Sequence, residues 1–569
     1  MGRQALASCS CFVLGVAFAW WLLGSMAFDP SAVQWLLSGD RGQSFLGWHL
    51  ARNEPLGFPL GRIPSYVHPT GASLALTDSY PWFSLLLLPA SPLFGEVFQH
   101  AGLWLALCYG LLALFSFHVL HFLTRDVLGS VVATSVVVAN PVLLARRGHL
   151  SLCAHWLIVA ALLLYLTSAV PESRRWFRVK AILLVLLASG THPYLATMVL
   201  AIVTAAAWSN RRSAASAIAS TLLLLATAWL GFHSFGYFTG AESTAAGFGF
   251  YSANVLALFD PNGQSTILPD LPNGGGQYEG FAYLGLAPLL VASFAGIAIT
   301  RRALRSEPVL VRTHPPLRLG ALLVVVAGCA VFALSSRPML GTIELARLGD
   351  VYALFEPLPS IFRSSGRFVW PLVYVAIFGA LTLLRLSVSR TLTFSLLCLL
   401  ALGAQAADSW HKYSRRSVAM QALRSPYRPL AAPEWRGIGR DYREIRLVPP
   451  AVVDTGCDGG IYPRSYYMPF ALVAGVEGMR VNSGHLSRSP RGIEASCAAQ
   501  VRAFERGDLE PDVVYVAARD LYDRISVDAF PATCGSLDGY RVCVSNARRT
   551  RLLDRLASRT EGTLSGSEE

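Results

Sequence analysis

The stretch LLSGDRGQSFLGWHLARNEPLGFPLG (residues 36–61) lies in a polar segment, residues 28–82, between the first apolar span and all the others. It places Asp40 just beyond the end of the first predicted membrane helix. The sequence TDSYPW (residues 77–82) places Asp78 just before the chain becomes apolar again. A loop so rich in Gly, Pro and Trp, with carboxylates at a membrane face, is more than a connector. We therefore predict chemistry in this loop, on lipid-linked substrates.

Composition assigns the chain to the polytopic membrane proteins. Hydrophobic residues make up 53% of its 569 residues and charged residues 14%, and the mean hydropathy is +0.45. These values exclude an ordinary soluble protein. The formal net charge of +12 does not indicate nucleic acid as a partner, because the basic residues form short clusters between apolar spans and no single patch.

Apolar stretches long enough to cross a bilayer predict about eleven spans. They cover residues 7–27, 98–124, 127–145, 150–170, 178–191, 193–209, 213–235, 281–300, 317–335, 367–386 and 390–406. The segment WFSLLLLPASPLFGEVF (residues 82–98) is apolar too, but Pro89 and Pro92 would leave helix hydrogen bonds unmade. We therefore interpret it as a re-entrant or interfacial piece and not as a span.

The loop charges predict the orientation, because Lys and Arg collect on the cytoplasmic side. With a cytoplasmic N-terminus, the cytoplasmic loops carry the basic clusters at residues 174–180, 211–212, 301–318 and 385–390. The opposite loops are poorer in positive charge, and residues 236–280 contain no Lys or Arg. Arg146 and Arg147 run against this trend. Ser25-Met26-Ala27 also fits a signal cleavage pattern, but the apolar stretch before it is long for a signal and favours an uncleaved span.

From residue 407 the composition becomes that of a soluble α/β domain. The runs EIRLVPPAVV (444–453), DVVYVAARD (512–520) and GYRVCVSN (539–546) predict buried strands, and RGIEASCAAQVRAFERG (491–507) predicts a helix. We predict a membrane domain at 1–406 with a large first periplasmic loop at 28–97, a periplasmic domain at 407–556 and a disordered tail at 557–569. The turn pair Asp538-Gly539 is typical of a hairpin.

The cysteines support an oxidising location for this second domain. Six of the ten lie in apolar spans, where a thiol is a small hydrophobe, and four belong to the C-terminal domain. An even set predicts disulfides, with Cys534–Cys543 as the first pair and Cys457–Cys497 as the second. A zinc site is the alternative, but the spacing of eight residues between Cys534 and Cys543 lacks the tight CxxC pattern.

Polar motifs recur at the predicted outer ends of the spans. If the helices form a bundle, these motifs converge on one face. They are RRGHLSLCAHW (146–156), GTHPY (190–194), LFDPNG (258–263), GGGQYEGFAYLG (274–285) and IFRSSGRFVWP (361–371).

The sequence resembles the GT-C superfamily of membrane glycosyltransferases. The resemblance rests on the first span, the large loop with an acidic residue at the span's end, the many-helix bundle and the outer C-terminal domain. The segments SGDRGQSFLGWHLARNEPLGFPLG, RRGHLSLCAHW, YEGFAYLG and FRSSGRFVWP are similar to a bacterial branch of that superfamily, and the similarity covers roughly residues 36–371. It implies a GT-C-like fold in the bacterial inner membrane.

The resemblance also implies a reaction, the inverting transfer of a sugar from a polyprenyl-phosphate donor to a cell-envelope glycan, lipid or protein on the periplasmic side. Asp40 would be the general base, and Asp78 would orient the acceptor or share a divalent ion with Asp40. Asp40, Asp78 and Glu279 are candidate ligands for Mg²⁺ or Mn²⁺, although arginines could stabilise the leaving phosphate without a metal. The candidate substrate-binding residues are His49, Arg146, His149, His155, His192, Tyr194, Tyr278, Glu279, Arg363 and Arg367.

Each of these residues also has a structural explanation. Asp40 could terminate a span or cap the next helix, and Asp78 could cap the 82–98 segment. His149 and His155 lie six residues apart, a poor spacing for a metal pair on one helix face, and His155 fits a hydrogen-bonded intramembrane residue. The interruption at His192 fits a broken helix that lines a cavity. The arginines could anchor helices at the headgroups, and the glycines around Glu279 could form a plain turn.

Two other functions remain open on the sequence. A transporter or flippase of a lipid-linked or polar envelope precursor predicts ionisable residues near span midpoints, whereas most charges here lie at span ends. A non-catalytic scaffold would make the loop carboxylates structural. Substitution of Asp40 by Asn distinguishes an enzyme from a scaffold. An enzyme would keep its fold and lose product, whereas a scaffold would keep its phenotype.

Overall fold

The computed structural model describes residues 2–210, 213–242, 245–305, 319–414, 419, 422, 428–523 and 530–564. The chain folds into two units, each assembled from segments that are distant in sequence. The first unit comprises Met1–Phe28, Ala101–Gly231 and Ser243–Met420. The second comprises Asp29–His100, Phe232–Glu242 and Gln421–Glu569. The first loop, which we assigned from the sequence to the membrane domain, therefore folds together with the C-terminal part of the chain.

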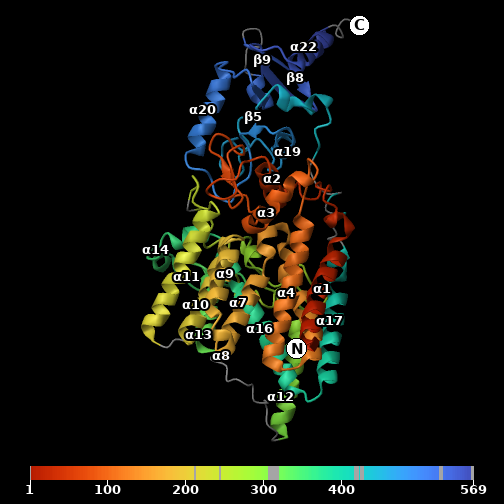
Figure 1. Ribbon diagram of the computed structural model, residues 1–569, viewed down its shortest axis with the longest axis vertical. Helices are drawn as coiled ribbons and strands as arrows, with labels where there is room; N and C mark the ends of the chain where they lie inside the picture. Colours follow the sequence, from red (N-terminus) through yellow and green to blue (C-terminus); the bar gives the residue numbers. More distant parts are fainter. Residues whose placement is uncertain are drawn as a thin grey trace. The chain divides into compact units, whose positions relative to one another are not determined.

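The first unit is helical (Figure 1). Its α-helices are α1 (Gly2–Leu23), α4 (Ala101–Thr124), α5 (Val127–Val138), α6 (Pro141–Ala145), α7 (Trp156–Thr167), α8 (Pro171–Arg174), α9 (Phe177–Ser189), α10 (Pro193–Ser209), α11 (Ala214–Ser234), α12 (Leu286–Leu304), α13 (Gly320–Leu334), α14 (Gly349–Ala353), α15 (Leu358–Ile361), α16 (Trp370–Ser387) and α17 (Thr391–Ser414). Short 3₁₀ turns occur at η1 (Ser25–Phe28), η3 (Arg146–Gly148), η4 (Leu150–Cys153), η5 (Gln277–Gly280) and η6 (Ser365–Val369), and β3 (Met339–Leu340) pairs with β4 (Ile343–Glu344).

In the described part of the chain, eight helical segments are long and apolar enough to cross a membrane. They are Gly2–Leu23, Ala101–Thr124, Val127–Gly148, Leu150–Thr167, Ala214–Ser234, Leu286–Leu304, Ser365–Ser387 and Thr391–Trp410. The predicted spans 193–209 and 317–335 correspond to the shorter apolar helices Pro193–Ser209 and Gly320–Leu334. The predicted span 178–191 is α9, which has 13 residues and begins with basic side chains. The polytopic helical fold is confirmed.

Polar side chains set the helix boundaries inside this apolar unit. Asp126 caps α5 by accepting a hydrogen bond from the backbone N–H of Gly129 at 2.9 Å. Asn140 caps α6 in the same way and is followed by a proline, and His192 caps α10, again before a proline. Proline tolerates the first helical position because its missing N–H has no partner there. The predicted helix interruption at residues 190–194 is confirmed.

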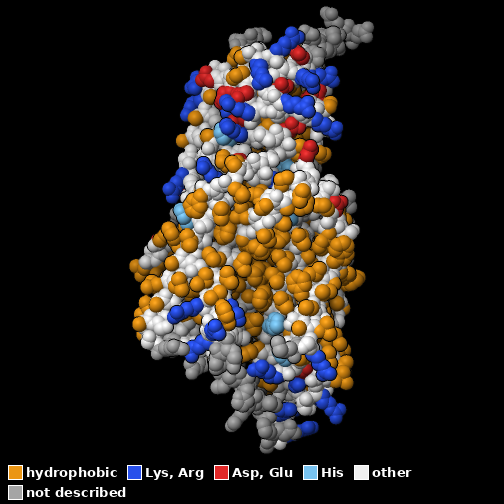
Figure 2. Space-filling view, in the orientation of Figure 1, with side chains coloured by type: hydrophobic (Ala, Val, Ile, Leu, Met, Phe, Trp, Pro, Cys, Tyr) orange, Lys and Arg blue, Asp and Glu red, His pale blue; other side chains and the backbone are white. Residues whose placement is uncertain are grey.

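Helix α4 packs against α1, α5, α7 and α16 at the centre of this unit, while α10 packs against α7, α9 and α13. The peripheral helices expose apolar side chains; on α11, Leu222 is 61% exposed and Trp229 60%. Figure 2 shows hydrophobic side chains covering the sides of these helices, with Lys and Arg gathered at the end where α8 lies. An apolar outer face on an already packed bundle is typical of a lipid-facing surface.

The first loop folds in the second unit. It contains α2 (Gly39–Ala51), β1 (Arg62–Ile63) paired with β2 (Ala72–Ser73), α3 (Pro81–Leu87) and the 3₁₀ turn η2 (Leu88–Leu93). The α-helical part ends at Leu87, just before Pro89, and Pro92 lies inside η2. The prediction that prolines interrupt segment 82–98 is therefore confirmed. Helix α2 packs against α19 (Met468–Glu477) of the C-terminal part.

The C-terminal part is an α/β fold with one mixed sheet in the order β6-β5-β7-β9-β8. The core strands β5 and β7 are parallel, and β9 runs antiparallel to β7 and β8. The predicted strands are β5, β7 and β9, and the predicted helix is α20. The bounds of these elements are β5 (Glu444–Val448), β6 (Arg480–Val481), α20 (Ile493–Glu505), β7 (Val513–Ala517), β8 (Ala532–Leu537) and β9 (Tyr540–Ser545). The other described elements are α21 (Arg519–Tyr522), α22 (Arg551–Leu564) and the 3₁₀ turns η7 (Pro433–Trp435) and η8 (Ile438–Arg440).

Both predicted disulfides are present, Cys457–Cys497 and Cys534–Cys543. The second joins directly opposite residues of the β8–β9 hairpin, whose loop is Asp538-Gly539, with φ of 51° and 82°. Positive φ at both positions matches the type I′ turn that this pair predicts. Helix α22 extends to Leu564, so backbone structure continues past residue 556, where the sequence predicted a disordered tail.

Candidate functional site

The break between α5 and α6 places Arg146 in the interior of the helical unit. The Asn140 cap and Pro141 restart the helix, α6 ends after five residues, and the chain turns through η3. As a result Arg146 is only 4% exposed, although it is a charged residue. Its guanidinium lies over the Trp370 ring, 5.4 Å from the ring centroid. A buried arginine requires a counter-charge, which a distant segment supplies.

Glu279 in η5 is that counter-charge, and it serves two arginines. Arg146 Nη1 donates to Glu279 Oε2 at 2.8 Å, and Arg367 Nε donates to the same oxygen at 3.0 Å. Arg146 Nη2 also donates to the backbone carbonyls of Tyr278 at 2.9 Å and Glu279 at 2.8 Å. His149 Nε2 lies 4.0 Å from Glu279 Oε1. The structure thus joins four predicted site residues, Arg146, His149, Glu279 and Arg367, in one cluster, which we call the Glu279 cluster.

Two glycines allow the segments that carry this cluster to approach each other. A Cβ on Gly366 would lie 2.6 Å from the Cα of Gly280, and a Cβ on Gly280 would lie 2.4 Å from the Cα of Ala253. Both distances are far below van der Waals contact between carbon atoms. The glycines beside Glu279 and Arg367 therefore permit close backbone packing, which brings η5 against η6. A plain turn, the alternative explanation for the glycine next to Glu279, does not account for this contact.

The electrostatics of the Glu279 cluster favour a bound anion. Burial by itself raises the pKa of the Glu279 carboxyl, but the charges of Arg367, Arg146 and His149 hold this pKa well below its usual range. The carboxylate is therefore ionised at neutral pH. The charges of this one carboxylate and the two guanidinium groups sum to +1, and all three residues are less than 10% exposed. A buried excess of positive charge is unfavourable on its own and is relieved by an anion.

Aromatic side chains surround this charge. Arg367 lies 4.9 Å from the centroid of the Tyr194 ring, and the Tyr194 hydroxyl accepts a hydrogen bond from the backbone N–H of Ser364 at 2.9 Å. His155 is fully buried, with Nδ1 2.9 Å from the Tyr374 hydroxyl and its ring 4.4 Å from that of Trp370. His155 is thus a buried, hydrogen-bonded residue, and its role in substrate binding stays a prediction.

Several buried polar atoms near the cluster have no hydrogen-bond partner among the described residues. They include Nε of Arg146, Nε2 of His155, Nε1 of Trp370 and the hydroxyl of Ser365. Buried polar groups in proteins are nearly always satisfied by protein, water or ligand. These atoms are therefore available to bind a polar group.

The remaining predicted residues of the helical unit lie at the edge of the cluster. His192 caps α10 through Nδ1, which accepts from the N–H of Tyr194 at 3.2 Å. Arg363 lies over the ring of Tyr251 at 6.0 Å and is half-buried. The Tyr278 side chain is 51% exposed, and only its backbone carbonyl contacts Arg146. Substrate binding by His192, Arg363 and Tyr278 stays a prediction.

The two predicted catalytic aspartates belong to the second unit and are connected through α2. Asp40 lies in the first turn of this helix and is half-buried; Ser38 is the N-cap residue. One turn later, Gln43 Nε2 donates to Asp78 Oδ2 at 3.5 Å and Ser44 Oγ donates to the Asp78 carbonyl at 3.0 Å. Residues i, i+3 and i+4 share a helix face. Asp40 and Asp78 therefore flank the same face of α2.

Asp78 has an unusual backbone conformation. Its φ is 54°, and that of Tyr80, the N-cap residue of α3, is 36°. Left-handed φ is costly for non-glycine residues and is concentrated at functional sites. The N-cap residue of α3 is Tyr80, whose own side chain makes no cap, and both the catalytic and the structural explanation of Asp78 stay predictions.

His49 is buried within the second unit. It is 1% exposed, and its Nε2 lies 3.1 Å from the carbonyl of Leu472 in α19. Burial lowers the pKa of His49 to about 4, so the ring is neutral and Nε2 donates to that carbonyl. These contacts give His49 a packing role between α2 and α19. Its role in substrate binding stays a prediction.

The donor set fits an anion better than Mg²⁺ or Mn²⁺. Among the residues that the structure describes, no group of three or more His, Cys, Asp or Glu side chains is arranged to hold a metal ion. Glu279 is already shared by two guanidinium groups. Both guanidinium groups contact Oε2 of Glu279, so a divalent cation on this carboxylate would lie beside two positive charges.

Some residues of these sites were not predicted from the sequence. Tyr374, the partner of His155, lies within an apolar span and has no motif around it. Gln43 and Ser44, which contact Asp78, could have been found from their i+3 and i+4 spacing to Asp40. The pairing of Glu279 with both arginines had no local signal, because the partners are 133 and 88 residues apart.

Comparison with known proteins identifies two matching family models. One, described as a domain of unknown function (DUF6311), matches residues 12–410, and the other, described as the DUF6311 C-terminal domain, matches residues 434–545. None of the curated proteins compared with the chain matches it.

Proposed function

The chain belongs to the DUF6311 family, and we propose that it is a membrane glycosyltransferase. In this proposal it transfers a sugar from a polyprenyl-phosphate-linked donor to a cell-envelope acceptor on the periplasmic side of the bacterial inner membrane. The eight long apolar helices support a membrane location. The full topology proposed is eleven spans, with the N-terminus in the cytoplasm and the C-terminal domain in the periplasm.

The observation that carries the proposal is the Glu279 cluster. Two arginines, each less than 10% exposed, share one carboxylate and leave a positive excess inside an apolar helical unit. Guanidinium groups bind phosphate through charge-assisted hydrogen bonds, and fixed positive groups stabilise the negative charge that develops on a leaving phosphate. Arg146 and Arg367 would hold the donor phosphate, while Glu279 orients both guanidinium groups.

The proton acceptor in this proposal is Asp40. A general base must reach the attacking hydroxyl and be ionised, and Asp40 is a half-buried carboxylate near the start of α2, where the helix dipole interacts favourably with negative charge. Asp78, with its left-handed backbone on the same side of α2, would orient the acceptor. The arginines perform the charge stabilisation, so the reaction as proposed is metal-independent.

The experiment compares envelope glycans by mass spectrometry in a deletion strain complemented with variants. Asp40→Asn is expected to reduce product formation roughly 10²- to 10⁴-fold, the contribution typical of a general base. Asp29→Asn is the matched control, because Asp29 lies in the same loop, is exposed and accepts hydrogen bonds from Ser31. An unchanged glycan profile in the deletion strain contradicts the transferase.

The same strains separate the rival functions. A folded Asp40→Asn protein with wild-type product would show that Asp40 is not the base and would favour a scaffold. Transport of a lipid-linked or polar precursor into vesicles by purified protein, without sugar transfer, would instead identify a transporter or flippase.

A further inference from the structure

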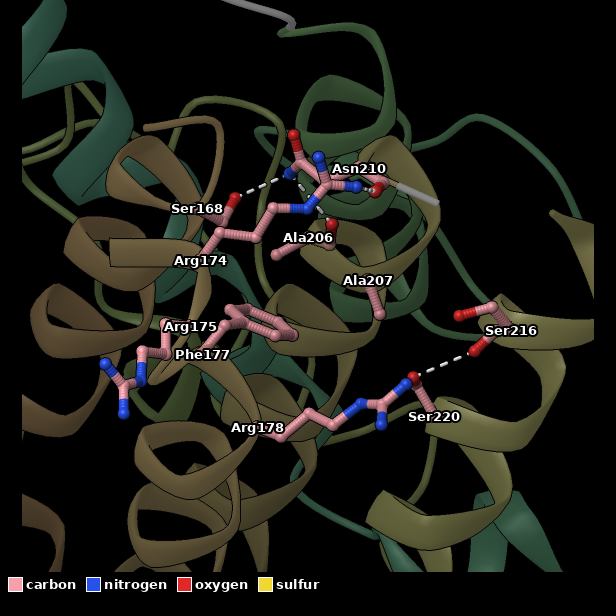
Figure 3. A pocket seen from close by; sticks show the side chains of 10 residues that line it. All are labelled: Ser168, Arg174, Arg175, Phe177, Arg178, Ala206, Ala207, Asn210, Ser216 and Ser220. Carbon is pink, nitrogen blue, oxygen red and sulfur yellow. Dashed lines mark hydrogen bonds between the residues drawn. The ribbon is translucent and has the colours of Figure 1, made fainter. Parts of the chain in front are cut away.

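A polar cavity lies in the helical unit, and none of the residues of the Glu279 cluster lines it. Its volume is about 320 Å³, and it is formed by the end of α7, by α8, by the first turn of α9, by the end of α10 and by the first turns of α11 (Figure 3). The lining residues are Ser168, Arg174, Arg175, Phe177, Arg178, Ala206, Ala207, Asn210, Ser216 and Ser220. Three of these ten described residues are arginines and none is Asp or Glu. The cavity therefore presents positive charge.

Arg174 is held in place at one side of the cavity. Its Nη2 donates to the carbonyl of Asn210 at 2.6 Å, and Asn210 Nδ2 donates to Ser168 Oγ at 2.6 Å and to the Ala206 carbonyl at 3.0 Å. These bonds connect α8 to the ends of α7 and α10. The guanidinium of Arg174 is therefore positioned before any ligand binds, which lowers the entropic cost of binding.

Arg178 approaches the cavity from α9 and points toward the serines of α11 (Figure 3). Ser220 Oγ donates to the carbonyl of Ser216 at 2.9 Å, and both serines line the cavity. Arg178 is also the second residue of α9, and the positive end of a helix dipole adds to the attraction for an anion. Two guanidinium groups and two hydroxyls thus converge on a volume that can hold a phosphate group.

An apolar stripe begins beside the cavity. Trp176, the N-cap residue of α9, is 53% exposed, and Val179 and Leu183 within the helix are 48% and 55% exposed. Their spacing of three and four residues places them on one face. The Arg175 guanidinium lies 5.5 Å from the centroid of the Trp176 ring, which connects the basic groups to this stripe. A phosphate site next to an exposed apolar surface provides both parts of a phospholipid site, one for the headgroup and one for an acyl chain.

We propose that this cavity binds the phosphate of an anionic phospholipid, with an acyl chain lying along Trp176, Val179 and Leu183. Arg174 and Arg178 donate to the phosphate oxygens, and the Ser216 hydroxyl donates to a remaining oxygen of the headgroup. The loop charges predict a cytoplasmic location for this end of the bundle, where anionic lipids attract clusters of Lys and Arg. The proposal is independent of the glycosyltransferase reaction.

Native mass spectrometry of the purified full-length chain tests the proposal. The protein is titrated with phosphatidylglycerol and, separately, with phosphatidylcholine of the same acyl chains. The wild type is expected to retain phosphatidylglycerol at least roughly tenfold more strongly, and Arg174→Gln/Arg178→Gln is expected to lose this preference. Arg301→Gln/Arg305→Gln, which removes the same charge from exposed residues of α12 and its C-cap, is expected to keep it.

Two further measurements distinguish a cavity from general attraction to charge. Ser220→Leu fills the cavity without a change of charge and is expected to weaken phosphatidylglycerol retention several-fold; unchanged retention would overturn the cavity as the site. Competition with inorganic phosphate at millimolar concentration is expected to have no effect, and displacement of the lipid would show a soluble-phosphate site instead. A size-exclusion profile equal to that of wild type establishes that each variant is folded. Equal lipid preference in Arg174→Gln/Arg178→Gln and in the control Arg301→Gln/Arg305→Gln would also overturn the proposal.

Discussion

Two buried carboxylate–arginine sites in the helical unit use the same chemistry with different charge balance. Asp126 caps α5 and accepts from Arg385 Nε at 2.6 Å and from the Thr391 hydroxyl at 2.8 Å. Glu279 accepts from both Arg146 and Arg367. The Asp126 site is neutral, with one carboxylate for one guanidinium. The Glu279 cluster carries an excess of positive charge.

This difference separates a structural site from a candidate ligand site. Asp126 uses its oxygens for a helix cap, an arginine and a threonine, all of which connect α5, α16 and α17. Burial alone raises the pKa of Asp126, and its hydrogen bonds to Gly129, Arg385 and Thr391 lower this pKa below the ordinary value. At the Glu279 cluster, two arginines donate to one oxygen of a single carboxylate, so the second guanidinium adds to the cost of burial. The anionic ligand that we propose would offset that cost.

The largest expected effect is that of neutralising each carboxylate. Glu279→Gln leaves two buried guanidinium groups without a counter-charge and is expected to cost about 3–5 kcal/mol in the free energy of unfolding, as is Asp126→Asn. Added polyprenyl phosphate should restore thermal stability in detergent to Glu279→Gln, since a bound anion replaces the carboxylate charge. The same ligand should leave Asp126→Asn unchanged. Equal rescue of both variants, or of neither, would remove the distinction between the two sites.

The next effect concerns activity. Arg146→Gln and Arg367→Gln are each expected to reduce sugar transfer roughly 10²- to 10³-fold, the cost of removing one group that stabilises developing charge. Arg385→Gln is the control, and its activity per folded molecule should stay near that of wild type. The measurement is product formation in proteoliposomes, normalised to the monodisperse fraction. A comparable loss of sugar transfer in Arg385→Gln would show that Arg146→Gln and Arg367→Gln lose activity through a folding defect.

A smaller effect is expected from the glycine contact between η5 and η6. Gly366→Ala introduces a Cβ at 2.6 Å from the Cα of Gly280 and is expected to cost about 1–3 kcal/mol by overpacking. Gly379→Ala, in α16, meets no heavy atom within 4 Å and is expected to be neutral or to stabilise by about 0.5–1 kcal/mol. Thermal unfolding of the two variants measures the difference. Equal thermal stability of the two variants would mean that η5 and η6 can move apart to accommodate the added Cβ.

The smallest effect is that of moderate acid on both carboxylate sites. Their folded-state pKa values are lowered, so the stability they contribute is present above the unfolded values of about 4 and is lost only as pH falls further. The difference in thermal stability between wild type and Glu279→Gln, or Asp126→Asn, should therefore be the same at pH 8 and pH 6. A difference that shrinks over this range would contradict the lowered pKa values.

His49 provides the positive control for that measurement. Its folded pKa of about 4 is below the ordinary value of 6.5, so the unfolded chain takes up a proton first as pH falls. Stability is then present above pH 6.5 and is lost as pH falls toward 4. Wild type should lose stability over this interval relative to His49→Asn.

Much of the architecture could be predicted from local sequence. Long runs without charge have few alternatives to a membrane helix, because the backbone must satisfy its own hydrogen bonds in lipid. The helix breaks at Asn140-Pro141 and His192-Pro193 follow from cap and proline chemistry. The strands around residues 444, 513 and 540 follow from short apolar runs between turns, and the disulfide pairs follow from cysteine positions.

The partners within each site were decided by the tertiary structure. The sequence alone indicated acidic and basic residues at helix ends, but it contained nothing that assigns Glu279 to both Arg146 and Arg367 or buries His49 against Leu472. Local sequence determines helices and caps because those interactions span a few residues. Charge pairing across 88 or 133 residues depends on which helix faces pack together and how closely their glycines allow the backbones to approach.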